Sequence, residues 1–160
     1  MEDKDLIKLT EEQVEKLCSL MGVDCDRTVT VEDSDNGEIK YIKVTFQGEE
    51  LGYMIGSHGR NLDSIQYILQ IILRKLIADK CDFRVFVDVS GYRQEKNEKL
   101  EQLALRKAED ARLLGEEVEL APMKPSDRRV VHLALMNFDD IETESRGEGR
   151  DRHIVIKLKK

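Results

Sequence analysis

The sequence predicts an α+β protein made of two small folding units, on three observations. Along residues 1–90, apolar side chains recur at helical spacing, then alternate, then recur at helical spacing again. A turn containing two glycines opens the second of these helical stretches. A further long helical stretch separates this part from a final helix and hairpin. The length of 160 residues suits two domains that each bury a modest core.

The first predicted element is a helix that begins at Thr10 and ends at Gly22. Gln13 follows Thr10 by three residues, which is the spacing of a capping box. A glycine at the end of an apolar-periodic stretch is a common helix stop. The apolar residues that recur at helical spacing between them are Val14, Leu17, Cys18 and Met21.

A β-hairpin is predicted next. Residues 27–32 and 39–46 alternate between apolar and polar side chains, as half-buried strands do. The residues between them are typical of a turn: Asp33-Ser34-Asp35-Asn36-Gly37. A short helical segment, residues 49–55, then leads into the two-glycine turn.

A long helix and a third strand complete the first unit. The apolar stripe of the helix is formed by Leu62, Ile65, Ile68, Leu69, Ile72 and Leu76. One face of the strand is formed by Phe83, Val85, Val87 and Val89. The predicted order is therefore helix, strand, strand, short helix, turn, helix, strand.

A connecting helix is predicted over residues 91–116, with Gly115 as its cap. Charged residues at i,i+4 spacing indicate that most of its surface is solvated, and a coiled-coil partner face is the alternative. Its narrow, alanine-rich stripe is formed by Leu100, Leu103, Ala104, Lys107, Ala111 and Leu114.

A last helix and a hairpin are predicted beyond this connection. The helix begins at Pro125, with Ser126 or Asp127 as its cap. Residues 141–145 and 152–158 are predicted to be strands, and the glycine-containing residues 146–150 form the tip between them.

The two-glycine turn has the chemistry of a contact with a nucleic-acid backbone. Glycine lacks a Cβ, so the main chain can approach a sugar-phosphate closely. The N–H groups and the dipole at the start of the following helix favour an anion. The segment reads Ile55-Gly56-Ser57-His58-Gly59-Arg60.

This turn, within the element order above, resembles the type II KH domain over residues 8–90. The resemblance implies that residues 56–59 clamp the backbone of a single strand and that Arg60 lies near a phosphate. It also implies that Ile55, Ile65 and the outer face of the hairpin border an apolar groove for the bases. The variable pair of the motif, Ser57-His58, is not basic, which weakens the cationic grip but keeps hydrogen-bond donors.

A basic group occupies the last forty residues. Arg128 and His132 are four residues apart, on one face of the predicted helix. Helix and hairpin together are predicted to present six basic side chains to one anion, since arginine's planar fork suits phosphate. These residues are Arg128, Arg129, His132, Arg146, Arg150 and Arg152.

Residues 117–160 resemble the R-three-H domain, which is named for its Arg-x-x-x-His and binds single-stranded nucleic acid. Arg128 and His132 take the name-giving positions. Ser145, Gly147 and Arg152 match the Thr-x-Ser-x-Gly…Arg stretch of that family. A KH domain followed by an R-three-H domain resembles the bacterial Jag (SpoIIIJ-associated) proteins.

That resemblance implies a non-catalytic protein of the cytoplasm that binds single-stranded RNA, with single-stranded DNA as an alternative. It further implies post-transcriptional regulation or RNA chaperoning linked to cell elongation and division. The implied protein partner is a small KH-only protein or a second copy. Most Jag proteins carry an extra N-terminal domain, so the sequence is either a short member or a piece of a longer one.

Composition limits the other classes of function. The net charge is −7, but residues 1–50 hold 14 acidic and 6 basic residues, whereas residues 121–160 hold 7 and 9. The acidity is therefore concentrated away from both motifs, and modest, salt-sensitive binding is expected. No apolar run is long enough to insert into a membrane. The three cysteines form no Cys-x-x-Cys pair, so buried reduced thiols and no metal or cofactor are expected.

Two alternatives compete with RNA binding. His58, His132 and His153 could serve a metal-free nuclease, although no motif fixes any pair of them. A protein-interaction scaffold with lost RNA binding would suit the acidic first third of the chain. No aromatic pair stands at the spacing of a base-stacking platform, and Tyr53, the aromatic residue near the turn, is interpreted as a helix-packing side chain.

Overall fold

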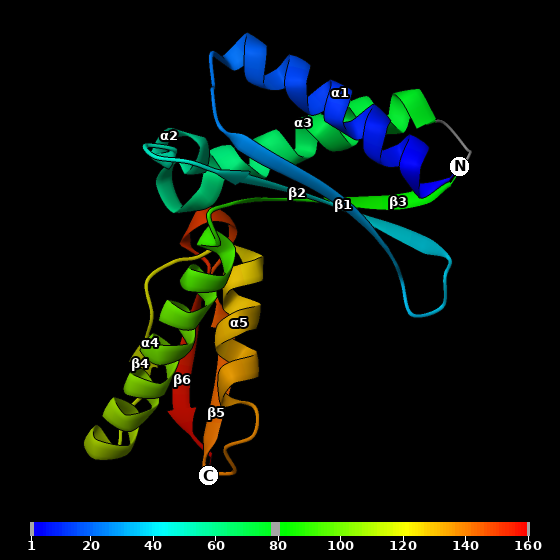
Figure 1. Ribbon diagram of the computed structural model, residues 1–160. Helices are drawn as coiled ribbons and strands as arrows, with labels where there is room; N and C mark the ends of the chain where they lie inside the picture. The colour runs from blue at the N-terminus through cyan, green and yellow to red at the C-terminus, as the bar shows by residue number, and fades with distance from the viewer. Residues whose placement is uncertain (1, 78–80, 160) are drawn as a thin grey trace. The chain divides into compact units, whose positions relative to one another are not determined.

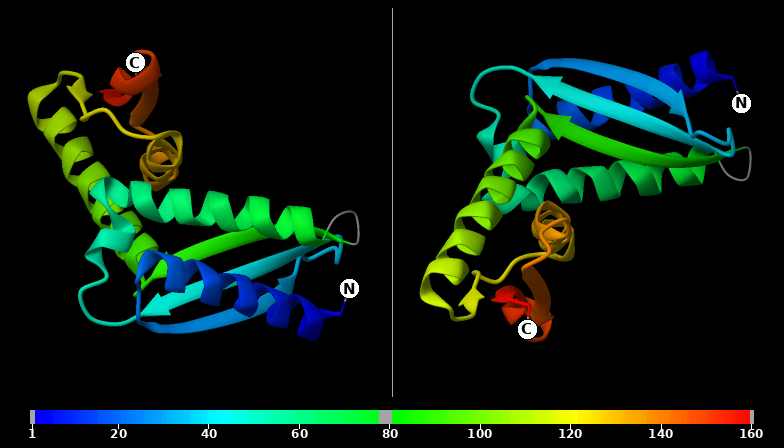
Figure 2. Two further views of the ribbon diagram at one scale, coloured as in Figure 1. Left: turned by 90° about the horizontal axis from the view of Figure 1, so that it is seen from above. Right: turned by 90° about the horizontal axis from the view of Figure 1, so that it is seen from below.

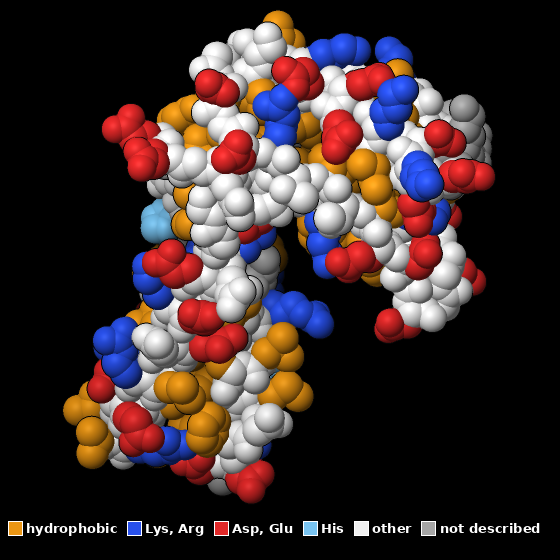
Figure 3. All heavy atoms as spheres, viewed as in Figure 1, with side chains coloured by type: hydrophobic (Ala, Val, Ile, Leu, Met, Phe, Trp, Pro, Cys, Tyr) orange, Lys and Arg blue, Asp and Glu red, His pale blue; other side chains and the backbone are white. Residues whose placement is uncertain are grey.

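The computed structural model describes residues 2–77 and 81–159, and the chain forms two compact units, Met1–Tyr92 and Arg93–Lys160. Helices and strands are mixed in both, so the predicted α+β class is confirmed. Of the described helices, none is both long and apolar enough to cross a bilayer. On the face seen in Figure 3, acidic and basic side chains are interspersed, with apolar side chains visible between them.

The first unit follows the predicted order of elements. Its sheet has the order β1-β2-β3, with β1 antiparallel and β3 parallel to β2. Helices α1 and α3 lie on one face of this sheet (Figure 1), and Figure 2 shows the same two layers from above and below. The bounds are α1 Asp3–Met21, β1 Asp26–Asp33, β2 Ile39–Gln47, α2 Gly52–Ile55, a 3-10 turn Ser57–Gly59, α3 Arg60–Ile77 and β3 Asp82–Val89.

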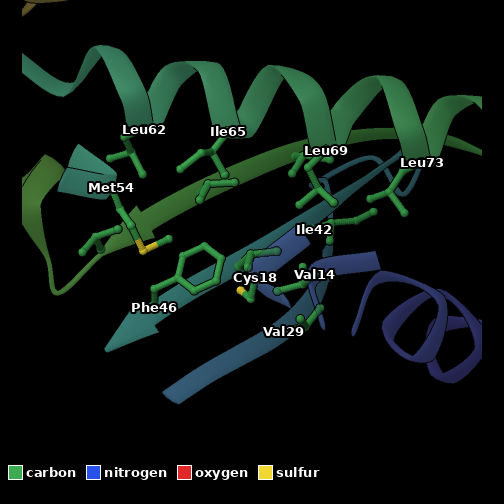
Figure 4. Close-up of a cluster of buried hydrophobic side chains, with 14 of the residues drawn as sticks. Val14, Cys18, Val29, Ile42, Phe46, Met54, Leu62, Ile65, Leu69 and Leu73 are labelled. Carbon is green, nitrogen blue, oxygen red and sulfur yellow. The ribbon is translucent and has the colours of Figure 1, made fainter. Parts of the chain in front are cut away.

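The core of the first unit lies between this sheet and the two helices. Alternate residues of each strand point toward α1 and α3, as a strand's period of two requires. Burying a leucine, isoleucine or phenylalanine contributes about 1.5–3 kcal/mol each, so this layer holds the unit together. Figure 4 shows its centre, formed by Val14, Cys18, Val29, Ile42, Phe46, Met54, Leu62, Ile65, Leu69 and Leu73.

The predicted start of the first helix is wrong. Helix α1 begins at Asp3, and Thr10 lies in its interior. The Thr10 Oγ1 donates to the backbone oxygen of Leu6 at 2.7 Å, and the side chain is buried. The hydroxyl thus has its hydrogen-bond acceptor one turn earlier in the same helix, which is the alternative to capping a helix end for a threonine. The predicted stop is confirmed, since Gly22 adopts a left-handed conformation with φ 67°.

The apolar stripe of α3 is only partly as predicted. Leu62, Ile65 and Leu69 are buried, and Leu73 and Ile77 continue the same row at i+4. By contrast, two predicted members of the stripe, Ile68 and Leu76, are 45% and 46% exposed. The sequence is apolar over a wider arc than the sheet covers, so periodicity alone did not locate the buried row.

The second unit is a three-stranded antiparallel sheet, in the order β4-β6-β5, with two helices packed on it. The short strand β4 was not predicted. The bounds are α4 Tyr92–Leu114, β4 Val118–Glu119, α5 Pro125–Leu135, β5 Ile141–Arg146, a 3-10 turn Gly149–Asp151 and β6 His153–Leu158.

Small side chains bring α4 close to the rest of this unit. Ala104, Ala108 and Ala111 are buried, whereas Leu114, a predicted member of the stripe, is 67% exposed. The core residues contributed by the other elements are Leu120, Val131, Leu135, Ile141, Ile154 and Ile156. Gly115 is the residue after the helix and has φ 68°, as the predicted cap requires.

The predicted cap of α5 is wrong. Lys124 is the residue before the helix and makes no side-chain cap, while Pro125 occupies the first helical position. Asp127 is buried, and its Oδ2 lies 2.6 Å from the Nζ of Lys96 on α4. The carboxylate that the sequence assigned to capping is therefore engaged in an ion pair that joins α4 to α5.

Candidate nucleic-acid interface

The two-glycine turn has a backbone conformation that requires glycine. Gly56 has φ 69° and ψ −174°, a region that is almost restricted to glycine. Gly59 has φ 82°, and His58 between them is also left-handed, with φ 54° and ψ 26°. Helix α3 begins directly after the turn, at Arg60. The turn therefore lies at the positive end of the dipole of a helix of 18 residues, where an anion is favoured.

Asn61 holds this turn in place. Its Nδ2 donates to the backbone oxygen of Tyr53 in α2 at 2.7 Å. A Cβ on Gly56 would lie 2.5 Å from the Cγ of Asn61, which is too close for any side chain. The asparagine thus fills the space that the missing Cβ leaves. Sequence reasoning missed this residue, and the only signal was its position just after the turn.

Packing against Tyr92 also favours glycine at position 59. A Cβ there would lie 3.0 Å from the Cε1 of Tyr92, closer than most side chains allow. Both glycines are therefore needed for the fold of the turn itself, in addition to any role in admitting a ligand. Substituting either of them would change the structure of the first unit and the ligand contact together.

The side chains of the turn differ in exposure. Ser57, His58 and Arg60 are exposed, and Ile55 is half-buried against the core. Ile65, predicted to border a groove, is instead buried in the core with 7% exposure, so that prediction is wrong. Tyr53, interpreted as a helix-packing side chain, is 56% exposed.

In the second unit, two hydroxyl groups on one face of β5 position two of the predicted basic residues. The Oγ1 of Thr143 lies 2.6 Å from the Nδ1 of His132 on α5. The Oγ of Ser145 accepts from the Nε of Arg152 at 2.9 Å. Residues two apart in a strand share a face and lie about 7 Å apart. The imidazole and the guanidinium are thus anchored side by side on the same face.

The remaining predicted residues of this face are placed less uniformly. Arg128 donates from Nη1 to the backbone oxygen of Met123 at 2.7 Å, so one of its donors is committed to the segment before α5. Arg129 and Arg150 are exposed. Gly147 has φ 83°, and a Cβ on it would lie 2.9 Å from the backbone oxygen of Asp151, so the tip closes tightly just before Arg152.

The structure does not bring Arg146 to this face. Strand residues alternate, so Arg146 shares the opposite face of β5 with Glu144. Its Nη1 and Nη2 donate to the carboxylate of Glu117 at 2.6 and 3.0 Å, and Glu144 accepts at 3.0 Å. These acceptors raise the pKa of Arg146 further above its ordinary value. The predicted set of six residues around one anion is therefore wrong for this chain.

The same ion pairs predict a pH dependence of stability. Arg146 lowers the pKa of Glu117, Lys157 and Arg146 lower that of Glu144, and Arg112 lowers that of Asp140. A lowered folded-state pKa stabilises the fold above the ordinary value and is lost as pH falls through the folded value. We expect the second unit to lose stability below about pH 4.5, measured by thermal melts followed by circular dichroism.

The matched variant for this prediction is Arg146→Gln, which removes the shared partner of two of these carboxylates. Its melting temperature should depend less on pH than that of the unchanged chain between about pH 5 and pH 3. An equal pH dependence in the two proteins would contradict the assignment.

The described residues show no group of three or more histidine, cysteine or acidic side chains arranged to hold a metal ion. The three cysteines are unpaired; Cys18 is buried, and Cys25 and Cys81 are half-buried. Burial, with a smaller contribution from Cys25, raises the pKa of Cys18 to about 11, so its thiol is unreactive at neutral pH. His153 donates from Nδ1 to the backbone oxygen of Asp151 at 2.8 Å.

Comparison with known proteins matches both units. Residues 11–89 match the family model described as the KH domain of KhpA/KhpB, and residues 95–158 match that of the R-three-H domain.

Three bacterial proteins, each named RNA-binding protein KhpB, are similar to this chain over most of its length. RNA-binding protein KhpB of Clostridium symbiosum is 34% identical over 149 residues, which are 93% of this chain and 64% of that protein. KhpB of Bacillus subtilis is 31% identical over 134 residues, 82% of this chain and 62% of that protein. KhpB of Lactiplantibacillus plantarum is 30% identical over 152 residues, which are 94% of this chain and 46% of that protein. The chain thus spans less than two thirds of the length of these relatives. With its KhpA/KhpB-type KH domain followed by an R-three-H domain, the chain belongs to the Jag-like proteins.

Proposed function

We propose that this chain binds single-stranded RNA, without catalysing a reaction on it. The observation that carries the proposal is the turn at residues 56–59, which combines a glycine-only backbone, exposed side chains at its tip and the start of a helix. Such a turn presents exposed side chains at the positive end of a helix dipole, where the phosphate of a sugar-phosphate backbone is favoured. The relatives are named RNA-binding proteins, which supports RNA as the ligand.

The second unit supplies a second contact in this proposal. The side chains of His132 and Arg152 are positioned by Thr143 and Ser145. In this proposal they donate hydrogen bonds to the sugar-phosphate backbone of the same RNA strand. Arg128, Arg129 and Arg150 belong to the same proposed contact by their places in α5 and at the tip. Arg146 is left out, because its guanidinium is already bound by two carboxylates.

Two weak contacts on one chain would give useful affinity through effective concentration. The net charge of −7 keeps non-specific attraction low, so each contact contributes modestly and depends on salt. We further propose that the protein acts in the cytoplasm in post-transcriptional regulation linked to cell elongation and division. A small KH-only protein is the proposed partner, since the matched KH family includes KhpA as well as KhpB.

A salt-titrated binding assay with a pool of random single-stranded RNA tests the proposal. The variant Ser57→Asp/His58→Asp adds two negative charges at exposed positions and leaves both glycines intact. Asp is compatible with the left-handed conformation of residue 58. We expect about a tenfold loss of affinity, because the new carboxylates repel the phosphates that the turn would hold. The matched control is Lys8→Gln/Lys16→Gln, which changes the net charge equally on exposed positions of α1 and should bind as before.

In the second unit, Arg152→Gln is compared with Arg146→Gln, which removes the same charge from the opposite face of the sheet. We expect Arg152→Gln to weaken binding and to reduce the salt slope by about one, and Arg146→Gln to change neither. If the unchanged chain binds no RNA at low salt, the proposed function is wrong, and a protein-interaction scaffold becomes the better interpretation.

A further inference from the structure

The face of the first sheet that points away from α1 and α3 carries an aromatic pair. Tyr41 in β2 and Phe86 in β3 are far apart in the sequence, yet their ring centroids lie 5.8 Å apart, with the ring planes at 60°. Phe86 is 44% exposed, and Tyr41 is half-buried. The strand neighbours of both residues, Ile42 and Val87 among them, point into the core instead, which places the pair on the open face.

Two basic side chains complete a square block on this face. Tyr41 is the register partner of Arg84, and Lys43 is the register partner of Phe86. The aromatic residues thus occupy one diagonal of the block and the basic residues the other. Arg84 is exposed, and within residues 2–77 and 81–159 no carboxylate pairs with it. Adjacent strands are about 5 Å apart and alternate residues about 7 Å, so the four side chains form one small surface.

We propose that this block, Tyr41, Lys43, Arg84 and Phe86, is a base-stacking platform for single-stranded RNA, separate from the turn at residues 56–59. Aromatic side chains on the open face of a sheet stack unpaired bases, and neighbouring basic groups meet the phosphates. The proposal rests on RNA as the ligand proposed above. It adds a site on the face of the first unit opposite to the helices, and it assigns the stacking that the sequence alone did not indicate.

The charged side chains of this face determine how much electrostatic attraction contributes to the affinity of the platform. Lys43 is paired with Glu32 at 2.6 Å, and both side chains are about half-exposed. Such a surface pair is weak, so a phosphate can exchange for the carboxylate. Two further acidic residues, Asp82 and Asp88, lie on the same face at the two ends of β3. Electrostatic attraction is therefore small here, and stacking on the rings supplies most of the affinity.

The experiment measures binding of a short end-labelled oligouridine to the full chain by fluorescence anisotropy, over a range of salt concentrations. The variant Tyr41→Leu/Phe86→Leu keeps apolar side chains on the strands but removes both π faces. We expect its affinity to fall about tenfold or more, with an unchanged salt slope, because the lost interaction is stacking and involves no counterions. Arg84→Gln should give a smaller loss with a reduced slope.

The matched control is Tyr67→Leu, which removes a 68% exposed aromatic ring from α3 of the same unit and should leave binding unchanged. A second probe, an abasic ribose-phosphate chain of the same length, should bind the unchanged protein as weakly as oligouridine binds the leucine variant. Circular dichroism of each variant confirms that the fold is retained.

Four results would overturn the platform. Wild-type affinity of the leucine variant, while Ser57→Asp/His58→Asp still weakens binding, would leave the proposed function intact and reduce the aromatic pair to a cross-strand contact. Equal affinities of the unchanged protein for the abasic chain and for oligouridine would likewise leave the proposed function intact and exclude stacking of bases on the aromatic pair. A change in self-association of the leucine variant without a change in RNA affinity would show that this face holds a second copy of the protein. Absence of any RNA binding by the unchanged chain would remove both proposals together.

Discussion

Replacing Asp127 by alanine is expected to lower the free energy of unfolding of the second unit by about 2–3 kcal/mol. The Asp127 carboxylate lies 2.6 Å from the Nζ of Lys96, and the two side chains are only 12% and 17% exposed. Removing one member of a buried ion pair leaves the other charge in a poorly solvated position, which costs about 3–5 kcal/mol when burial is complete. The remaining exposure of this pair reduces the expected loss.

The matched control is Asp110→Ala. Asp110 is also paired with a lysine, Lys107 at 2.8 Å, but the side chains are 43% and 39% exposed. An exposed pair contributes about 0–1 kcal/mol, so this variant should be nearly neutral. A similar loss in both variants would contradict the idea that burial makes the Lys96–Asp127 pair important.

Denaturant unfolding measures the stability of both variants. The positions of the tyrosines allow the unfolding of the first unit to be followed separately. All four tyrosines, Tyr41, Tyr53, Tyr67 and Tyr92, belong to the first unit. Tyrosine fluorescence should therefore be unchanged by Asp127→Ala, while circular dichroism, which follows the helices of both units, should show an earlier transition. The apolar pair Lys96→Met/Asp127→Leu should recover much of the lost stability, because it removes both charges together.

The fold was largely predictable, because local periodicity determines where each strand and helix lies. The alternation of Phe83, Val85, Val87 and Val89 predicted β3 correctly, since every second residue must face the core. Residue roles at helix ends were less predictable. Thr10 and Asp127 both have the chemistry of caps, but tertiary packing placed one inside a helix and the other in an ion pair.

The candidate site was predictable only where one segment contains it. The turn at residues 56–59 was visible as a motif, whereas its support by Asn61 through Tyr53 depends on how α2 meets α3. The opposite directions of Arg146 and Arg152 depend on strand register, which the motif does not contain.

The aromatic pair was not predictable for the same reason. Sequence spacing detects a stacking platform only within one strand, but Tyr41 and Phe86 come from two parallel strands joined by a long crossover. Long-range pairing of this kind follows from the sheet order and not from any local pattern.

Replacing Gly56 by alanine is expected to lower the free energy of unfolding of the first unit by about 2–4 kcal/mol. Part of this loss comes from the backbone, because φ 69° with ψ −174° costs a residue with a Cβ about 1–3 kcal/mol. The rest comes from Asn61, whose side chain lies 2.5 Å from the new Cβ and must leave its acceptor, the backbone oxygen of Tyr53. Tyrosine fluorescence during denaturant unfolding measures the loss.

The matched control is Gly52→Ala, four residues earlier in α2. Gly52 has no positive φ, and its Cβ would meet nothing within 4 Å, so this variant should be neutral or slightly stabilising. The double variant Gly56→Ala/Asn61→Ala relieves the clash but keeps the backbone strain, and it should be less destabilised than the sum of the two single variants. Additive losses would contradict the role of Asn61. Because Gly56 is needed for the fold of the turn, a loss of RNA binding after its substitution does not by itself identify a ligand contact, whereas substitutions at Ser57 and His58 do.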